Sequence, residues 1–232
     1  MTSLRVRLRA REMLIATACL VLVLGGAFLA ASLTQSREIF SLSPPAGGAP
    51  DISAERRIEL HRTFFTAWAA LVLVTPALCT FLFRRTSERA ARYWLAFWTV
   101  SYIAFLVHFY WAVSVFFGND WNRILHNNRM RVSAPIPDTI FAVWWGLDVL
   151  LAWLRRRSEA LWIRIQRALI HLAAFVLFFL GSVKEGELNG RDGKPFWSVA
   201  LGLMMGVAVL ISGLIWLGDW LKKRKARIIA TA

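Results

Sequence analysis

The chain has 232 residues, of which 57% are hydrophobic, and its formal net charge of +14 comes from 28 Lys and Arg against 14 Asp and Glu. This apolar fraction exceeds the ~45–50% of soluble domains, so an ordinary soluble protein is excluded. The basic residues alternate with apolar segments instead of forming one basic surface, which excludes nucleic acid as the partner, and the two cysteines lie inside apolar segments, which argues against a disulfide framework.

Six apolar segments follow one another along the chain, and each is long enough, or nearly so, to cross a bilayer. The hydrocarbon core is about 30 Å thick and needs roughly 20 helical residues. The sequence therefore predicts an all-α integral membrane protein, a single six-helix bundle, with crossings at 13–33, 63–83, 93–118, 136–154, 161–181 and 196–217. The first segment is long and has no small-residue cleavage site at its end, which favours an uncleaved anchor over a signal peptide.

The connections between these segments alternate in charge. Lys and Arg gather before the first segment, between the second and third, between the fourth and fifth, and after the sixth. The remaining three connections are nearly neutral. This pattern follows the positive-inside rule and predicts that both termini are cytoplasmic, in a bacterial inner membrane. Residues 34–62 should then form a periplasmic loop that ends in a short interfacial helix with Asp51 or Ser53 as its cap.

Three titratable side chains lie deep inside predicted crossings: His108, Asp148 and His171. Each is ten or eleven residues from the outer end of its segment, or roughly 15 Å at 1.5 Å per residue. Such residues are costly in lipid and therefore suggest function. Three interpretations remain open. The histidines are the two axial ligands of a haem b, the three residues form a proton relay in which Asp148 carries the proton, or all three fix helix packing through hydrogen bonds.

Two further patterns concern packing. Gly202 and Gly206 give the sixth segment a small-xxx-small face for a neighbouring helix or another subunit. Tryptophans near the predicted inner ends of the segments are typical of an aromatic belt at the membrane interface: Trp94, Trp98, Trp153, Trp162, Trp216 and Trp220.

The order of segments resembles the ferric-reductase-like transmembrane family, especially its haem-b membrane subunits of the methionine-sulfoxide reductase type. The resemblance is carried by LHRTFFTAWAALVLVTPAL (60–78), RAARYWLAFWTVSYIAFLVH (89–108) and IRIQRALIHLAAFVLFFLGSVK (163–184). It implies six helices and haem b ligated by His108 and His171. The family often carries a second histidine about four turns later on the fifth helix, where this chain has none, so one haem is expected instead of two.

The leading functional hypothesis is a haem-b electron-transfer subunit that moves electrons from quinone, or from a cytoplasmic donor, to a periplasmic acceptor. Asp148 would tune the site or carry a proton, and quinone is a further candidate ligand. Such a chain would be at most the membrane subunit of an oxidoreductase system. The alternatives are a non-catalytic subunit of a larger membrane complex and a small proton-coupled carrier. The expected partners are the lipid bilayer and other membrane or periplasmic subunits.

Overall fold

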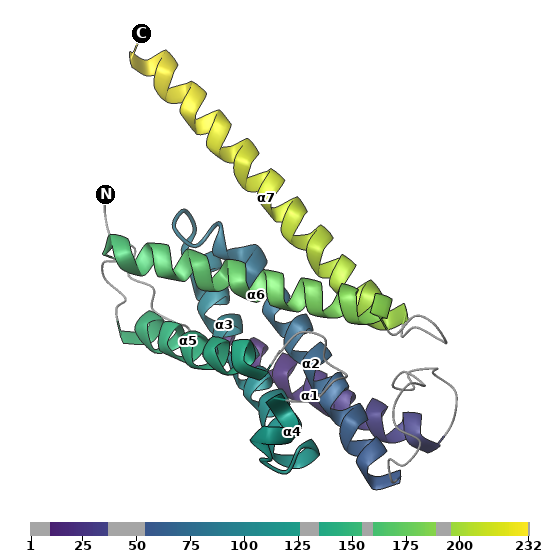
Figure 1. Cartoon of the computed structure of the whole chain (residues 1–232). Coiled ribbons are helices and arrows are strands. Elements are labelled where there is room, and N and C mark those ends of the chain that lie inside the picture. The colour runs from purple at the N-terminus through teal and green to yellow at the C-terminus, as the bar shows by residue number, and fades with distance from the viewer. Residues whose placement is uncertain (1–9, 37–53, 126–134, 155–159, 189–195, 232) are drawn as a thin grey trace.

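A computed structural model describes residues 10–36, 54–125, 135–154, 160–188 and 196–231, and within these ranges every regular element is helical (Figure 1). The elements are α1 (Ala10–Ser36), α2 (Ala54–Phe81), α3 (Glu88–Tyr110), its π-helical continuation η1 (Trp111–Phe116), α4 (Trp121–Leu125), α5 (Pro135–Leu154), α6 (Leu161–Leu188) and α7 (Phe196–Thr231).

Five of these helices are long and apolar enough to cross a membrane. The spans are Ala10–Leu33, Arg62–Phe81, Glu88–Phe116, Leu161–Val183 and Ser198–Ala226. The described residues are therefore all-helical, as predicted, and the five apolar helices support the prediction of a multi-pass membrane protein in contact with lipid.

Helix α5 contains the predicted fourth crossing, 136–154, but is not one of these five. Its outward side is a continuous aliphatic stripe in which every side chain is at least 53% exposed: Ile140, Val143, Leu147, Leu150 and Leu154. Its opposite side buries Trp145 and Asp148. A polar interior beneath an apolar exterior reverses the pattern of a water-soluble helix, and it suits a helix that faces lipid.

The short interfacial helix expected within 34–62 does not exist as a separate element. Its described part, from Ala54 onward, is the first part of α2, which runs unbroken to Phe81. No Gly or Pro separates Ala54 from Thr63, so nothing interrupts the backbone hydrogen bonds where the apolar segment begins. The capping residues Asp51 and Ser53 lie outside the described residues.

Contacts near the helix ends fix the relative directions of α1, α2 and α3. The start of α1 meets the start of α3 through the Glu12–Arg92 ion pair, at 3.0 Å. Farther along both helices, Phe28 packs on Trp111 with 4.9 Å between ring centroids. The Trp111 indole also donates a hydrogen bond to Glu59, near the start of α2. Helices α1 and α3 therefore run in the same direction and α2 runs against them.

The remaining long helices continue the alternation. In α5, Phe141 packs on Phe105 and Trp153 donates a hydrogen bond to Thr99, so α5 is antiparallel to α3. In α6, His171 contacts Trp94 and Phe178 contacts Phe105, so α6 is parallel to α3. Helix α7 is antiparallel to α6, as shown below, and all six long helices therefore alternate in direction.

Helices α6 and α7 approach closely at the two glycines noted in the sequence. Ser198 donates a hydrogen bond to the Ser182 carbonyl at 3.0 Å. A Cβ on Gly202 would overlap the Ser182 hydroxyl, and one on Gly206 would lie 2.8 Å from Phe179 Cε2. The small-xxx-small face therefore packs against α6 of the same chain.

Gly202→Leu should lower the free energy of unfolding by about 1–3 kcal/mol because the new side chain has to push α7 away from Ser182. Thermal unfolding in mild detergent measures this change. Gly213→Leu is the matched control, since a Cβ there meets no described atom within 4 Å. Equal effects of the two substitutions would contradict the close α6–α7 contact.

Candidate functional site

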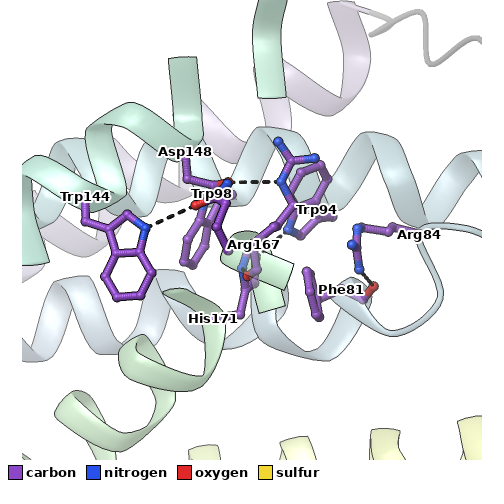
Figure 2. Close-up of polar contacts among 9 residues, drawn as sticks. Phe81, Arg84, Trp94, Trp98, Trp144, Asp148, Arg167 and His171 are labelled. Atoms are coloured by element: carbon purple, nitrogen blue, oxygen red, sulfur yellow. Dashed lines mark hydrogen bonds and ion pairs between the residues drawn. The ribbon is translucent and has the colours of Figure 1, made fainter. Parts of the chain in front are cut away.

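The centre of the bundle holds a buried ion pair between α5 and α6. Arg167 Nε lies 3.0 Å from Asp148 Oδ1, and the two residues are 1% and 0% exposed. Asp148 also accepts hydrogen bonds from Trp98 Nε1 at 2.9 Å and from Gln166 Nε2 at 2.6 Å (Figure 2). The Asp148 side chain thus meets three donor groups, the Trp98 indole, the Gln166 amide and the Arg167 guanidinium, which come from α3 and α6.

This ion pair is part of a wider network of indole and amide groups. Gln166 Oε1 accepts a hydrogen bond from Trp144 Nε1 at 3.1 Å, so Gln166 connects Trp144 to Asp148. The Arg167 guanidinium lies 5.1 Å from the ring centroid of Trp94, in cation–π range. The network joins α3, α5 and α6, and the opposite charges of Asp148 and Arg167 cancel within it.

His171 lies beside this ion pair, and both of its ring nitrogens are engaged. Nδ1 is 2.7 Å from the Arg167 carbonyl oxygen, which can only accept, so Nδ1 carries the proton. Nε2 is 2.8 Å from Trp94 Nε1, which can only donate, so Nε2 is the acceptor. These two partners define a neutral imidazole in one tautomer, because a second proton on Nε2 would face the indole N–H.

Aromatic rings cover both faces of the same imidazole. Phe81 of α2 stacks on one face, with 3.9 Å between ring centroids, and Trp98 of α3 stacks on the other at 3.8 Å. The Arg84 guanidinium lies 3.8 Å from the Phe81 ring centroid on α2 (Figure 2). His171 is therefore the middle layer of a stack that joins α2, α6 and α3.

His108 lies in a different part of the bundle. Its Nδ1 is 2.9 Å from the Thr63 carbonyl oxygen of α2, so Nδ1 is again the donor. One turn beyond His108, at the start of η1, Trp111 donates a hydrogen bond to Glu59 of α2, which also pairs with Arg62 of α2. His108 is half-buried, and the hydrogen bond at Nδ1 leaves Nε2 as the acceptor nitrogen of the neutral ring. Histidines that ligate metals commonly donate their other N–H to a backbone carbonyl in this way.

The structure brings together two of the three predicted site residues, Asp148 and His171, but not His108. Trp98, which contacts both of them, precedes His108 by ten residues on α3, a rise of about 15 Å. Two axial ligands must reach the same iron atom. With the two histidines at different levels, and with both nitrogens and both faces of His171 engaged, the pair as arranged does not fit bis-histidine ligation of haem b.

The described residues contain no group of three His, Cys, Asp or Glu side chains placed to hold a metal ion.

Three of the buried residues in this network are not predicted as site residues from the sequence. The sequence predicts Trp94 and Trp98 in the aromatic belt and does not single out Arg167. Instead all three are buried, at 1%, 6% and 0% exposure. A buried carboxylate in lipid needs a counter-charge. Arg167 lies one turn before His171 on the same helical face, and this position could have identified it as the counter-ion of Asp148.

Comparison with known protein families, with curated proteins and with solved structures finds no match to this chain.

Asp148→Asn should lower the free energy of unfolding by about 3–5 kcal/mol, because it leaves the buried Arg167 charge without its counter-ion. Denaturation of the detergent-purified protein measures the loss. Asp219→Asn on α7 is the matched control, since Asp219 is exposed and its removal should change stability by no more than about 0.5 kcal/mol. Unchanged stability in Asp148→Asn would show that the ion pair does not hold the bundle together.

Proposed function

We propose that this chain is a non-catalytic, multi-pass subunit of a larger membrane assembly, and that its polar core serves to fix the arrangement of the helices. The observation that carries this proposal is the engagement of the buried polar groups with one another. Both oxygens of Asp148 accept hydrogen bonds, and both nitrogens of His171 have a partner. A site that exchanges protons or binds a solute needs at least one of these groups in contact with water or ligand.

We further propose that all six long helices cross a bacterial inner membrane, with both termini in the cytoplasm. The alternating directions of the helices and the lipid-suited exterior of α5 support this topology, as does the alternating charge of the connections. Cysteine labelling of residues 85–91 from each side of the membrane tests it. Labelling from the periplasmic side would overturn the proposed orientation.

The assembly itself is tested on protein extracted with mild detergent from the membranes of its own host. The chain has a mass of 26.3 kDa. Native mass spectrometry should find it in a species of defined, larger mass that contains at least one other polypeptide at fixed stoichiometry. A chain recovered only as a monomer would contradict the proposal.

A structural role also makes a prediction about charge balance. Asp148→Asn combined with Arg167→Met removes both charges, and neutral replacement of a buried ion pair is often tolerated where loss of one partner is not. The double variant should therefore recover most of the stability and assembled mass that Asp148→Asn alone loses. A double variant as damaged as the single one would show that Asp148 has a role beyond charge balance, as a proton carrier requires.

The haem-b hypothesis remains a prediction, and His108 gives it one favourable observation, the ligand-like hydrogen bond from Nδ1 to Thr63. A dithionite-reduced minus oxidised absorbance spectrum tests it on wild-type protein, His108→Ala and His171→Ala expressed with haem available. The arrangement of His171 predicts a spectrum without b-type bands. Bands that disappear in both variants would contradict the structural proposal and establish that both histidines ligate haem b.

A further inference from the structure

Helix α7 packs against the bundle along only its first half. Met205 is 1% exposed, and Gly202 and Gly206 face α6. Beyond Gly213 the pattern changes, and each described side chain of α7 is exposed. Figure 1 shows this half of α7, drawn in yellow, standing apart from the other helices.

The exposed half of α7 is apolar first and then strongly basic. The apolar part carries six large side chains that are 37–60% exposed: Leu214, Ile215, Trp216, Leu217, Trp220 and Leu221. Four consecutive basic residues follow, all exposed: Lys222, Lys223, Arg224 and Lys225. We refer to these four residues as the basic collar. Asp219 is the one acidic residue between Leu214 and Ala232, so the segment has a large positive net charge.

Helical geometry distributes the basic collar around α7. Successive residues of a helix with 3.6 residues per turn are rotated by about 100°. The four side chains therefore project to four different sides, and together they encircle the helix. The apolar residues before them are likewise exposed on every side, so the segment presents no single face to a neighbour.

Helix length places the collar relative to the apolar core of a bilayer. The stretch from Ser198 to Leu221 rises about 36 Å, slightly more than the hydrocarbon core of about 30 Å. Trp216 and Trp220 precede the collar, and the Arg224 guanidinium lies 5.5 Å from the Trp220 ring centroid. Tryptophan is typical of the boundary between acyl chains and headgroups, so the collar falls at headgroup level.

We propose that the C-terminal half of α7 is a binding site for anionic phospholipids, whose phosphate groups contact the basic collar while their acyl chains cover Leu214 to Leu221. Charge complementarity favours an anionic headgroup, since each Lys or Arg near an anionic surface strengthens binding about fivefold. The encircling arrangement selects lipid over a protein partner, because lipids surround a helix whereas a protein contacts one side of it. This site is independent of the proposed subunit role, which concerns the core of α3, α5 and α6.

The test compares lipid retention by the full chain and by two charge-matched variants. Each protein is purified in mild detergent, mixed with equal amounts of phosphatidylglycerol and phosphatidylcholine, and analysed by native mass spectrometry. The collar variant is Lys222→Gln/Lys223→Gln/Arg224→Gln/Lys225→Gln. The control variant, Arg155→Gln/Arg156→Gln/Arg157→Gln/Arg164→Gln, removes four charges elsewhere, and circular dichroism checks that both variants fold.

Wild-type protein and the control variant should retain phosphatidylglycerol over phosphatidylcholine, and the collar variant should lose that preference by at least about fivefold, the effect of one such charge. Three results would overturn the proposal: no preference in the wild type, equal losses in the two variants, or a collar variant that keeps the full preference. Retention of a co-purified protein that disappears only in the collar variant would assign the collar to a protein partner instead.

Discussion

The buried contact between Asp148 and Arg167 is the interaction on which the arrangement of α3, α5 and α6 depends. In a bilayer the surrounding solvent is as apolar as a leucine side chain, so apolar contacts alone give little preference for one helix arrangement over another. A charge in the same environment is very unfavourable without its partner. The need to keep Asp148 against Arg167, with Trp98 and Gln166 completing its hydrogen bonds, therefore gives the helices a specific register that lipid cannot replace.

His171 extends this constraint to α2. Its imidazole lies between Phe81 and Trp98. Its two nitrogens form hydrogen bonds with the Arg167 carbonyl and the Trp94 indole. A histidine is well suited to such a position because its two nitrogens, one donor and one acceptor, lie on the edge of a flat ring that can also stack. In the proposed structural role, His171 lies as a polar aromatic residue between two rings, and the chemistry that suits it to this position also suits a metal ligand.

The amino-acid sequence predicts the membrane helices well, because the cost of exposing backbone and charge to lipid acts on each segment separately. It also identifies Asp148 and His171 as unusual, since a polar side chain in an apolar segment is visible in one dimension. The partners of Asp148 and His171, by contrast, cannot be recognised from the sequence alone. Arg167 and Trp98 look like ordinary interface residues in the sequence, and only the packing of α3 against α5 and α6 turns them toward Asp148. The neighbour of His108 is likewise defined only by packing, since its Nδ1 meets the carbonyl oxygen of Thr63 near the start of the α2 span.

The confinement of α7 packing to its first half has a mechanical consequence. The contacts of α7 with the bundle lie in its first half, around Gly202, Met205 and Gly206, and the part from Gly213 to Thr231 is about 27 Å long. By simple geometry on that length, a tilt of α7 by about 10° at Gly213 displaces its C-terminal end by about 5 Å. Small changes in the fit between two glycines and Ser182 or Phe179 would thus be amplified several-fold at the C-terminus, while the polar core of the bundle stays in place.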